Sequence, residues 1–219
     1  MTSILLTLFT FIFTTNMALA EFFQDMSSII KNNKERLSYG ISVTDFNKDG
    51  QFEFVVTGFK HPNLALSYKK GYLEDVNVDE VFSDDIRSTI GVAACDIDND
   101  GFEELYFLNT DTYSGQKQYS DRLLDNENTI IDLFQIEKNL KSLNLTAGRS
   151  VVCVDRNGVG TYGFYVANYG GPTRFYELIN NQIIDKAPVL NIDKITGGRA
   201  VISGHILGNQ MDIFAANER

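Results

Sequence analysis

The sequence contains few of the residues on which disulfide scaffolds and most hydrolases depend. Two cysteines in 219 residues are too few for cross-links to replace a hydrophobic core. The two histidines, His61 and His205, lie in different parts of the chain, and each suits a surface or turn position better than that of a ligand. No G-x-S-x-G elbow, H-E-x-x-H helix or phosphate-binding loop is present. These absences predict that the protein is not an enzyme.

Positive charge is also scarce. The chain has 19 Lys and Arg against 29 Asp and Glu, for a net charge of −10. Nucleic acid and anionic lipid are bound mainly through Lys and Arg, so this balance argues against both as partners. An acidic chain suits a partner that supplies positive charge, and Ca²⁺ is the simplest one.

Long hydrophobic runs are missing except at the N-terminus. Residues 1–20 contain no charged side chain, include an apolar run from Ile4 to Phe13, and end in the small-x-small sequence Ala18-Leu19-Ala20. This run is too short for a comfortable membrane span, so it predicts a cleaved signal peptide and a secreted, extracellular protein without membrane insertion. An N-terminal anchor helix is the alternative.

The rest of the chain repeats itself. Asp45 and Asp96 are 51 residues apart, Asp96 and Asp155 are 59 apart, and a further 49 residues lead to Gly204. A period near 50, with an apolar run, a polar turn and a second apolar run in each unit, is typical of a four-stranded propeller blade. The prediction is an all-β chain: a lead-in over residues 21–36 and a partial β-propeller of about three and a half blades over 37–219. The units are about 37–87, 88–146, 147–196 and an incomplete 197–219.

The incomplete last unit leaves two interpretations open. The sequence is a fragment, a truncated gene product or a splice form, or the chain closes by self-association through its open blade edges with a second copy. The apolar second strands of all four units are expected to be buried on both faces between neighbouring sheets.

Two of the turns carry a metal-binding pattern. The first reads D-x-N-x-D-G-x-x-E and the second D-x-D-x-D-G-x-x-E. Oxygen ligands at alternate positions of a tight loop converge on one hard cation, and Ca²⁺ takes six to eight oxygens. An EF-hand is excluded, because Val56 and Phe107 stand where its bidentate Glu would be. A polar hairpin turn without metal is the alternative. The predicted ligands are Asp45, Asn47, Asp49, Gln51 and Glu53 in the first loop and Asp96, Asp98, Asp100, Phe102 and Glu104 in the second, with Gln51 and Phe102 contributing backbone carbonyls.

Cys95 and Cys153 precede the first Asp of their units by one and by two residues. In a strand this difference turns the side chains to opposite faces, so buried thiols are expected in preference to a disulfide. Asn144-Leu145-Thr146 is a glycosylation sequon, and Asn144 is expected to carry a glycan in a secreted protein.

Several stretches outside the turns carry a family resemblance. The two loops resemble the FG-GAP or VCBS repeats of integrin alpha subunits, which implies that the predicted blades are of the FG-GAP/VCBS type. Longer segments resemble the cartilage acidic protein family: Gly91–Gly101, Glu104–Thr110, Ala147–Asp155, Tyr165–Tyr169, Thr196–Val201 and Asp212–Phe214. The resemblance extends from Leu37 to Arg219 and is similar to the N-terminal half of that family's propeller. It implies an extracellular, acidic, glycosylated matrix protein with a multi-bladed propeller and a C-terminal domain.

The function predicted from these features is that of a secreted calcium-binding matrix or receptor-binding module, in which Ca²⁺ braces the blade hairpins and exposed loops contact an extracellular protein or matrix partner. The alternatives are a propeller hydrolase or lyase that uses channel carboxylates, and a truncated non-functional product.

Overall fold

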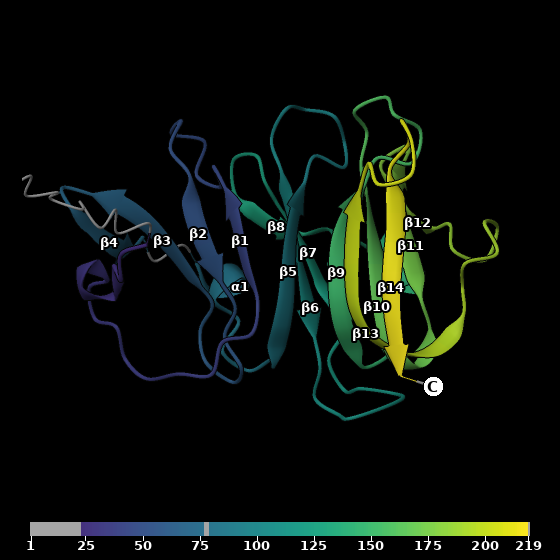
Figure 1. Cartoon of the computed structure of the whole chain (residues 1–219), viewed down its shortest axis with the longest axis horizontal. Coiled ribbons are helices and arrows are strands. Elements are labelled where there is room, and N and C mark those ends of the chain that lie inside the picture. The colour runs from purple at the N-terminus through teal and green to yellow at the C-terminus, as the bar shows by residue number, and fades with distance from the viewer. Residues whose placement is uncertain (1–22, 77–78, 219) are drawn as a thin grey trace, which may run out of the picture.

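The computed structural model describes residues 23–76 and 79–218. The predicted signal peptide, residues 1–20, lies outside the described residues. The described chain is all-β in architecture, with antiparallel strands in three sheets that stand side by side (Figure 1).

The first sheet has the order β1-β2-β3-β4 and the second the order β5-β6-β7-β8, so each is a four-stranded meander. The strands of the first sheet are β1 (Ile41–Thr44), β2 (Glu53–Val56), β3 (Leu64–Lys69) and β4 (Tyr72–Asp75). Those of the second are β5 (Thr89–Cys95), β6 (Glu104–Asn109), β7 (Arg122–Asn126) and β8 (Ile130–Asp132).

The third sheet has six strands in the order β12-β11-β10-β13-β14, and β9 also pairs with β10. Its strands are β9 (Gly148–Val154), β10 (Gly163–Pro172), β11 (Arg174–Ile179), β12 (Gln182–Asp185), β13 (Ile195–Gly204) and β14 (Asp212–Glu218). The far end of β10 bonds to β13 at Tyr169↔Gly197 and Pro172↔Ile195. These bonds join the predicted third and fourth units into one sheet.

The helical segments are short. They are η1 (Ser27–Ile29), α1 (Glu80–Ser83), η2 (Leu133–Gln135) and η3 (Glu137–Ser142). The last two lie between the second and third sheets in the sequence, and Phe134 of η2 is fully buried in the core between those sheets.

Burial on two faces is confined to the middle of the molecule. Every residue of β6 is buried, because one face packs against the first sheet and the other against the third. In β2, Val55 is buried but Phe54 is exposed, and most of β14 is exposed. The expectation that all four second strands are buried on both faces is therefore correct for β6 and for residues 163–168 of β10, and it is wrong for β2 and β14. Each of these two strands has one face that no described sheet covers.

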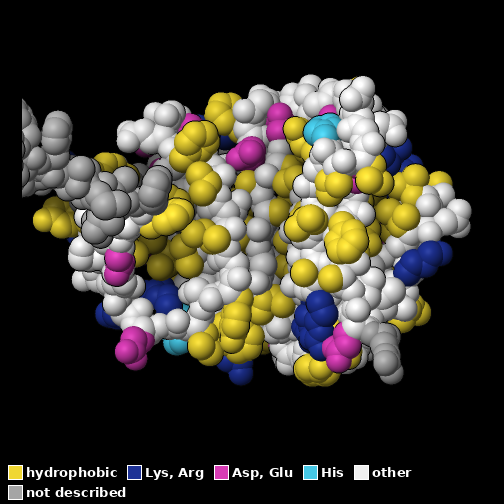
Figure 2. Space-filling model, viewed as in Figure 1, with side chains coloured by type: hydrophobic (Ala, Val, Ile, Leu, Met, Phe, Trp, Pro, Cys, Tyr) yellow, Lys and Arg dark blue, Asp and Glu magenta, His cyan; other side chains and the backbone are white. Residues whose placement is uncertain are grey.

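The uncovered faces present apolar side chains to solvent. On the first sheet, Ile41 and Val43 are 62% and 48% exposed, and on the last hairpin Ile202 and Phe214 are 57% and 66% exposed. Figure 2 shows hydrophobic side chains gathered over β13 and β14. Contiguous exposed apolar surface of this kind marks a site where another surface can pack.

The preference for free cysteines is wrong. Cys95 at the end of β5 and Cys153 in β9 form a disulfide, with their Cα atoms 6.0 Å apart. The two strands belong to adjacent sheets, so the bridge must join the front of one sheet to the back of the next. Such a bridge requires one cysteine to point forward from its sheet and the other to point backward from the next sheet. The sequence argument against a disulfide assumed that both side chains must point to the same face, which holds only for strands within one sheet.

Candidate metal sites

The two predicted metal loops connect the first and second strands of the first two sheets. Residues 45–52 lie between β1 and β2, and residues 96–103 lie between β5 and β6. The glycines at the sixth loop position, Gly50 and Gly101, have φ of +84° and +92°, in the left-handed region that favours glycine. The chain therefore reverses at these points and carries its acidic residues on one side of a β-hairpin.

Backbone hydrogen bonds give both loops the same shape. The first carboxylate, Asp45 or Asp96, accepts hydrogen bonds from the N–H groups of the fifth and sixth loop residues at 2.8 to 3.2 Å. The side chain at position three, Asn47 or Asp98, accepts from the N–H of the fifth residue at 2.9 and 3.0 Å. The side-chain oxygens at positions one, three and five are thus held in fixed directions within each loop.

The second loop brings its carboxylates together. Oxygens of Asp96, Asp98 and Glu104 all lie within 4.8 Å of one another, close enough to coordinate one ion. Glu104 is 2% exposed, and its Oε2 accepts a hydrogen bond from the N–H of Ile97 at 2.8 Å. Burial, followed by the charges of Asp98, Asp125 and Asp100, raises the pKa of Glu104 to about 8. A bound cation would remove this repulsion, so the residues present fit a hard divalent ion.

The first loop fits an ion less well, because one of its ligands is an amide. The Nδ2 of Asn47 donates a hydrogen bond to Oε1 of Glu53 at 3.2 Å, which satisfies part of the charge that a cation would otherwise neutralise. The other carboxylate oxygen of Glu53, Oε2, is buried and has no hydrogen-bond partner. Burial raises the pKa of Glu53 above its ordinary value. This loop retains an unsatisfied oxygen for a cation, but with one carboxylate fewer than the second loop.

The two residues expected to contribute carbonyls make the same contact in each loop. The N–H of Gln51 donates to Asp49 at 2.9 Å, and the N–H of Phe102 donates to Asp100 at 2.8 Å. Their role as carbonyl ligands stays a prediction.

The third and fourth hairpins keep a turn without a full ligand set. Asp155 accepts hydrogen bonds from four successive N–H groups between Asn157 and Gly160. Asp212 accepts two, from Ile206 and Leu207. Here one acidic residue accepts hydrogen bonds from the loop backbone by itself.

Three residues around the second loop were missed by sequence reasoning. The ammonium of Lys48, in the first loop, lies 3.8 Å from Oδ2 of Asp100 and 4.0 Å from the ring centre of Phe102. Asp125 and Glu127 come from β7 and the turn after it, and both lie near Asp98. No sequence motif contains these residues, since they approach the loop only through sheet packing and strand pairing.

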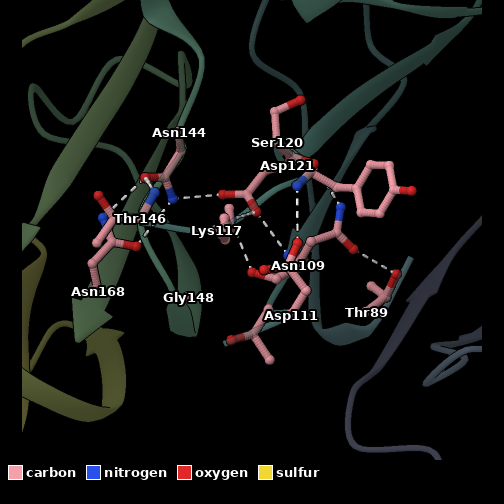
Figure 3. Close-up of polar contacts among 12 residues, drawn as sticks. Thr89, Asn109, Asp111, Lys117, Ser120, Asp121, Asn144, Thr146, Gly148 and Asn168 are labelled. Atoms are coloured by element: carbon pink, nitrogen blue, oxygen red, sulfur yellow. Dashed lines mark hydrogen bonds and ion pairs between the residues drawn. The ribbon is translucent and has the colours of Figure 1, made fainter. Parts of the chain in front are cut away.

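A buried polar network lies between the second sheet and the third (Figure 3). Lys117 and Asp121 form an ion pair with both side chains fully buried. Asp121 also accepts hydrogen bonds from the N–H of Asn109 at 2.7 Å, the hydroxyl of Tyr106 at 2.7 Å and the amide of Asn144 at 2.6 Å. Burial lowers the pKa of Lys117 and the charge of Asp121 opposes that effect.

Asn144, the predicted glycosylation site, is part of this network. Its side chain is fully buried, and the same Nδ2 that would bond to a glycan donates to Asp121 and, at 3.0 Å, to Asn168 (Figure 3). A glycan on this nitrogen would break both contacts and would have no space in the folded chain. The placement of Asn144 therefore counts against glycosylation here, because the sequon carries no information about burial.

Comparison with known proteins identifies the relatives of these loops. The FG-GAP-like repeat family matches residues 45–107, which include both predicted metal loops. Cartilage acidic protein 1 of Xenopus tropicalis is 44% identical over 213 residues, and the human and mouse proteins are 42% and 40% identical over the same length. The chain is a homologue of cartilage acidic protein 1. The predicted family resemblance is confirmed.

These alignments cover 85% of the chain but only 32–33% of each cartilage acidic protein, so the chain spans about a third of the length of the curated relatives it matches. The names of these relatives describe an acidic protein of cartilage and no reaction.

Within residues 23–76 and 79–218, no helix has both the length and the apolar character needed to cross a bilayer.

Proposed function

We propose that this chain is a calcium-binding, non-catalytic module of a secreted extracellular matrix protein, and that its sheets are blades of a β-propeller. The homology to cartilage acidic protein 1 supports the matrix assignment. The antiparallel meanders, repeated at about the period of a propeller blade and stacked side by side, support the propeller assignment (Figure 1).

The observation that carries the calcium proposal is the convergence of Asp96, Asp98 and Glu104. Asp100 and the carbonyl of Phe102 would complete this ligand set, and the first loop would use Asp45, Asn47, Asp49, Glu53 and the carbonyl of Gln51. A bound Ca²⁺ would supply positive charge that holds the turn and the start of the next strand together. The chemistry is structural, because the ligands are oxygens of one hairpin and no nucleophile or histidine accompanies them.

Calcium is expected to stabilise the protein through the loops of the first two sheets. At a free Ca²⁺ concentration 100 times the Kd, one such site adds about 2.7 kcal/mol. For a domain of this size that is a rise in Tm of roughly 5–10 °C. Calorimetric unfolding and titration of the secreted chain, with and without a chelator, measure both effects. The first loop is expected to bind more weakly than the second, because Asn47 stands where the second loop has Asp98.

A matched pair of variants separates metal binding from turn stability. Asp96→Asn and Asp155→Asn change equivalent residues of the second and third hairpins, and only the first lies in a carboxylate cluster. Asp96→Asn is expected to lose one bound ion, whereas Asp155→Asn is expected to keep the wild-type response to Ca²⁺. Equal calcium responses in both variants and the wild type would show that the second loop is a turn without metal.

The uncovered sheet faces are the proposed partner surface, and the occupant we propose is a second copy of the chain. Ile202 and Phe214 on β13 and β14 present apolar surface that a facing sheet would cover (Figure 2). Light scattering coupled to size-exclusion chromatography is expected to show a dimer for the wild type and a monomer for Phe214→Lys. A wild-type monomer at high micromolar concentration would eliminate self-association and favour a different matrix protein as the partner.

A further inference from the structure

Two arginines occupy equivalent β-bulges on neighbouring strands. Arg149 in β9 and Arg199 in β13 each follow a glycine and precede a small residue and a valine. The strand register shifts by one residue at both positions, so neither arginine has a residue opposite it in the paired strand. The N–H of Val201 donates to the hydroxyl of Ser150 at 3.2 Å, which places the two bulges side by side. Bulges of this kind re-aim a side chain and are common next to active sites.

The second sheet forms the same bulge without a charge. Where β5 pairs with β6, Ile90 is the residue that has no partner opposite it. An apolar side chain is therefore sufficient for this backbone conformation. The arginines of the third sheet are not needed to build the bulge, and their placement points to a role beyond the fold.

The guanidinium groups of these two arginines converge on one pair of tyrosine rings. The Cζ atom of Arg149 lies 5.5 and 5.3 Å from the ring centres of Tyr113 and Tyr169, and that of Arg199 lies 5.7 and 4.7 Å from the same rings. The ring centres are 5.2 Å apart, and Arg199 also donates a hydrogen bond to the hydroxyl of Tyr113 at 2.9 Å. Cations at these distances are attracted by the ring faces. The four side chains form one arginine–tyrosine cluster, and Tyr113 in it is 65% exposed.

Positive charge in the cluster is only partly neutralised. Arg199 forms an ion pair with Glu218. Arg149 forms no ion pair with a carboxylate of the described chain, and it donates instead to one hydroxyl and two backbone carbonyls. Burial, followed by the charge of Arg199, lowers the pKa of Arg149. Two like charges are thus held close together in a chain whose net charge is −10, and a bound anion would remove their repulsion.

A cavity beside the cluster adds to the positive charge. It has a volume of about 350 Å³, and its lining includes Arg149, Tyr113 and Lys60. Asp111 is the one carboxylate among the described residues that line it, and both of its oxygens accept hydrogen bonds from the backbone N–H groups of residues 118 and 119. The cavity therefore offers an anion two cationic side chains and one carboxylate that is already engaged.

We propose that the arginine–tyrosine cluster binds a carboxylate on an acidic segment of a partner protein. The planar fork of a guanidinium matches a carboxylate, and two such groups side by side grip one anion from both sides. Arginine and tyrosine are also the residues that most often carry the binding energy of protein interfaces. The acidic charge of the rest of the chain disfavours a long polyanion. This site uses no residue of the predicted metal loops and is independent of the proposed calcium binding.

Fluorescence anisotropy of a labelled hexaglutamate peptide with the secreted chain, at low salt and a fixed Ca²⁺ concentration, tests this site. Arg199→Ile introduces the side chain of the equivalent bulge in the second sheet, so the fold is expected to be kept, which circular dichroism verifies. Its affinity is expected to fall about tenfold or more, the usual effect of losing a hydrogen bond to a charged group. Arg199→Lys, which keeps the charge but lacks the fork, is expected to lose part of the affinity.

Arg156→Gln is the matched control, since it removes the same charge from an arginine that pairs with Glu177 outside the cluster. It is expected to bind hexaglutamate as the wild type does. Asp96→Asn is also expected to keep the wild-type affinity, which excludes a peptide held through a metal ion. Equal affinities of the wild type, Arg199→Ile and Arg156→Gln would overturn the proposal. So would a wild type that does not bind hexaglutamate, whether or not it binds a heparin hexasaccharide.

Discussion

Replacing Lys117 with methionine is expected to lower the free energy of unfolding by about 3–5 kcal/mol, which is the usual cost of removing one partner of a buried ion pair. Asp121 would then be a fully buried carboxylate without a counter-charge. Its remaining hydrogen bonds, from Asn109, Tyr106 and Asn144, stabilise the charge but do not neutralise it. Lys117 also donates to the carbonyl oxygen of Asn109 at 2.8 Å, and that contact is lost as well.

Urea unfolding at a fixed Ca²⁺ concentration measures this loss and separates it from metal binding. Lys141→Met is the control, since Lys141 is an exposed lysine of η3 and its loss should change stability by less than about 0.5 kcal/mol. The network lies where the loop after β6 meets the third sheet (Figure 3). A loss below about 1 kcal/mol for Lys117→Met would mean that the pair is open to solvent in solution.

Breaking the Cys95–Cys153 bridge is expected to cost about 4 kcal/mol in the chain-entropy treatment of a loop closed over 58 residues. The bridge links β5 to β9, the first strands of adjacent sheets. Its loss gives the unfolded chain more conformational freedom between these two segments, and this favours unfolding. Unfolding of the oxidised protein with and without a strong reductant measures the difference.

The double variant Cys95→Ala/Cys153→Ala provides the control. It should be less stable than the oxidised protein and should not respond to reductant. Mass spectrometry after alkylation under denaturing conditions should find no free thiol in the untreated secreted chain. Two alkylated cysteines in the untreated protein would contradict the disulfide and support the buried thiols that the sequence predicts.

Local patterns in the sequence were sufficient for the hairpin turns. The spacing of Asp, Asn, Asp and Gly within nine residues depends only on neighbours in the chain, and both metal loops have the predicted shape. The repeat of these turns near 50 residues likewise located successive sheets of similar construction. The family resemblance rested on the same segments and is confirmed by the cartilage acidic protein relatives.

Contacts between sheets could not be read from the sequence. The disulfide was missed because the sequence does not specify which face of the next sheet Cys95 contacts. The triplet predicts a glycan on Asn144 but says nothing about burial, whereas in the fold Asn144 bonds to Asp121 and Asn168. Asp125 and Glu127 belong to no motif, and they reach the loop carboxylates only through the pairing of β6 with β7 and the turn that follows.

The sequence by itself determined the hairpin turns, the acidic residues that they carry and the antiparallel strands, because each of these depends on residues close together along the chain. Only the tertiary structure decided which carboxylates converge, which cysteines pair and which polar groups are buried. Those outcomes depend on how sheets separated by 50 residues or more of chain pack against one another, and packing selects faces that a one-dimensional pattern does not specify.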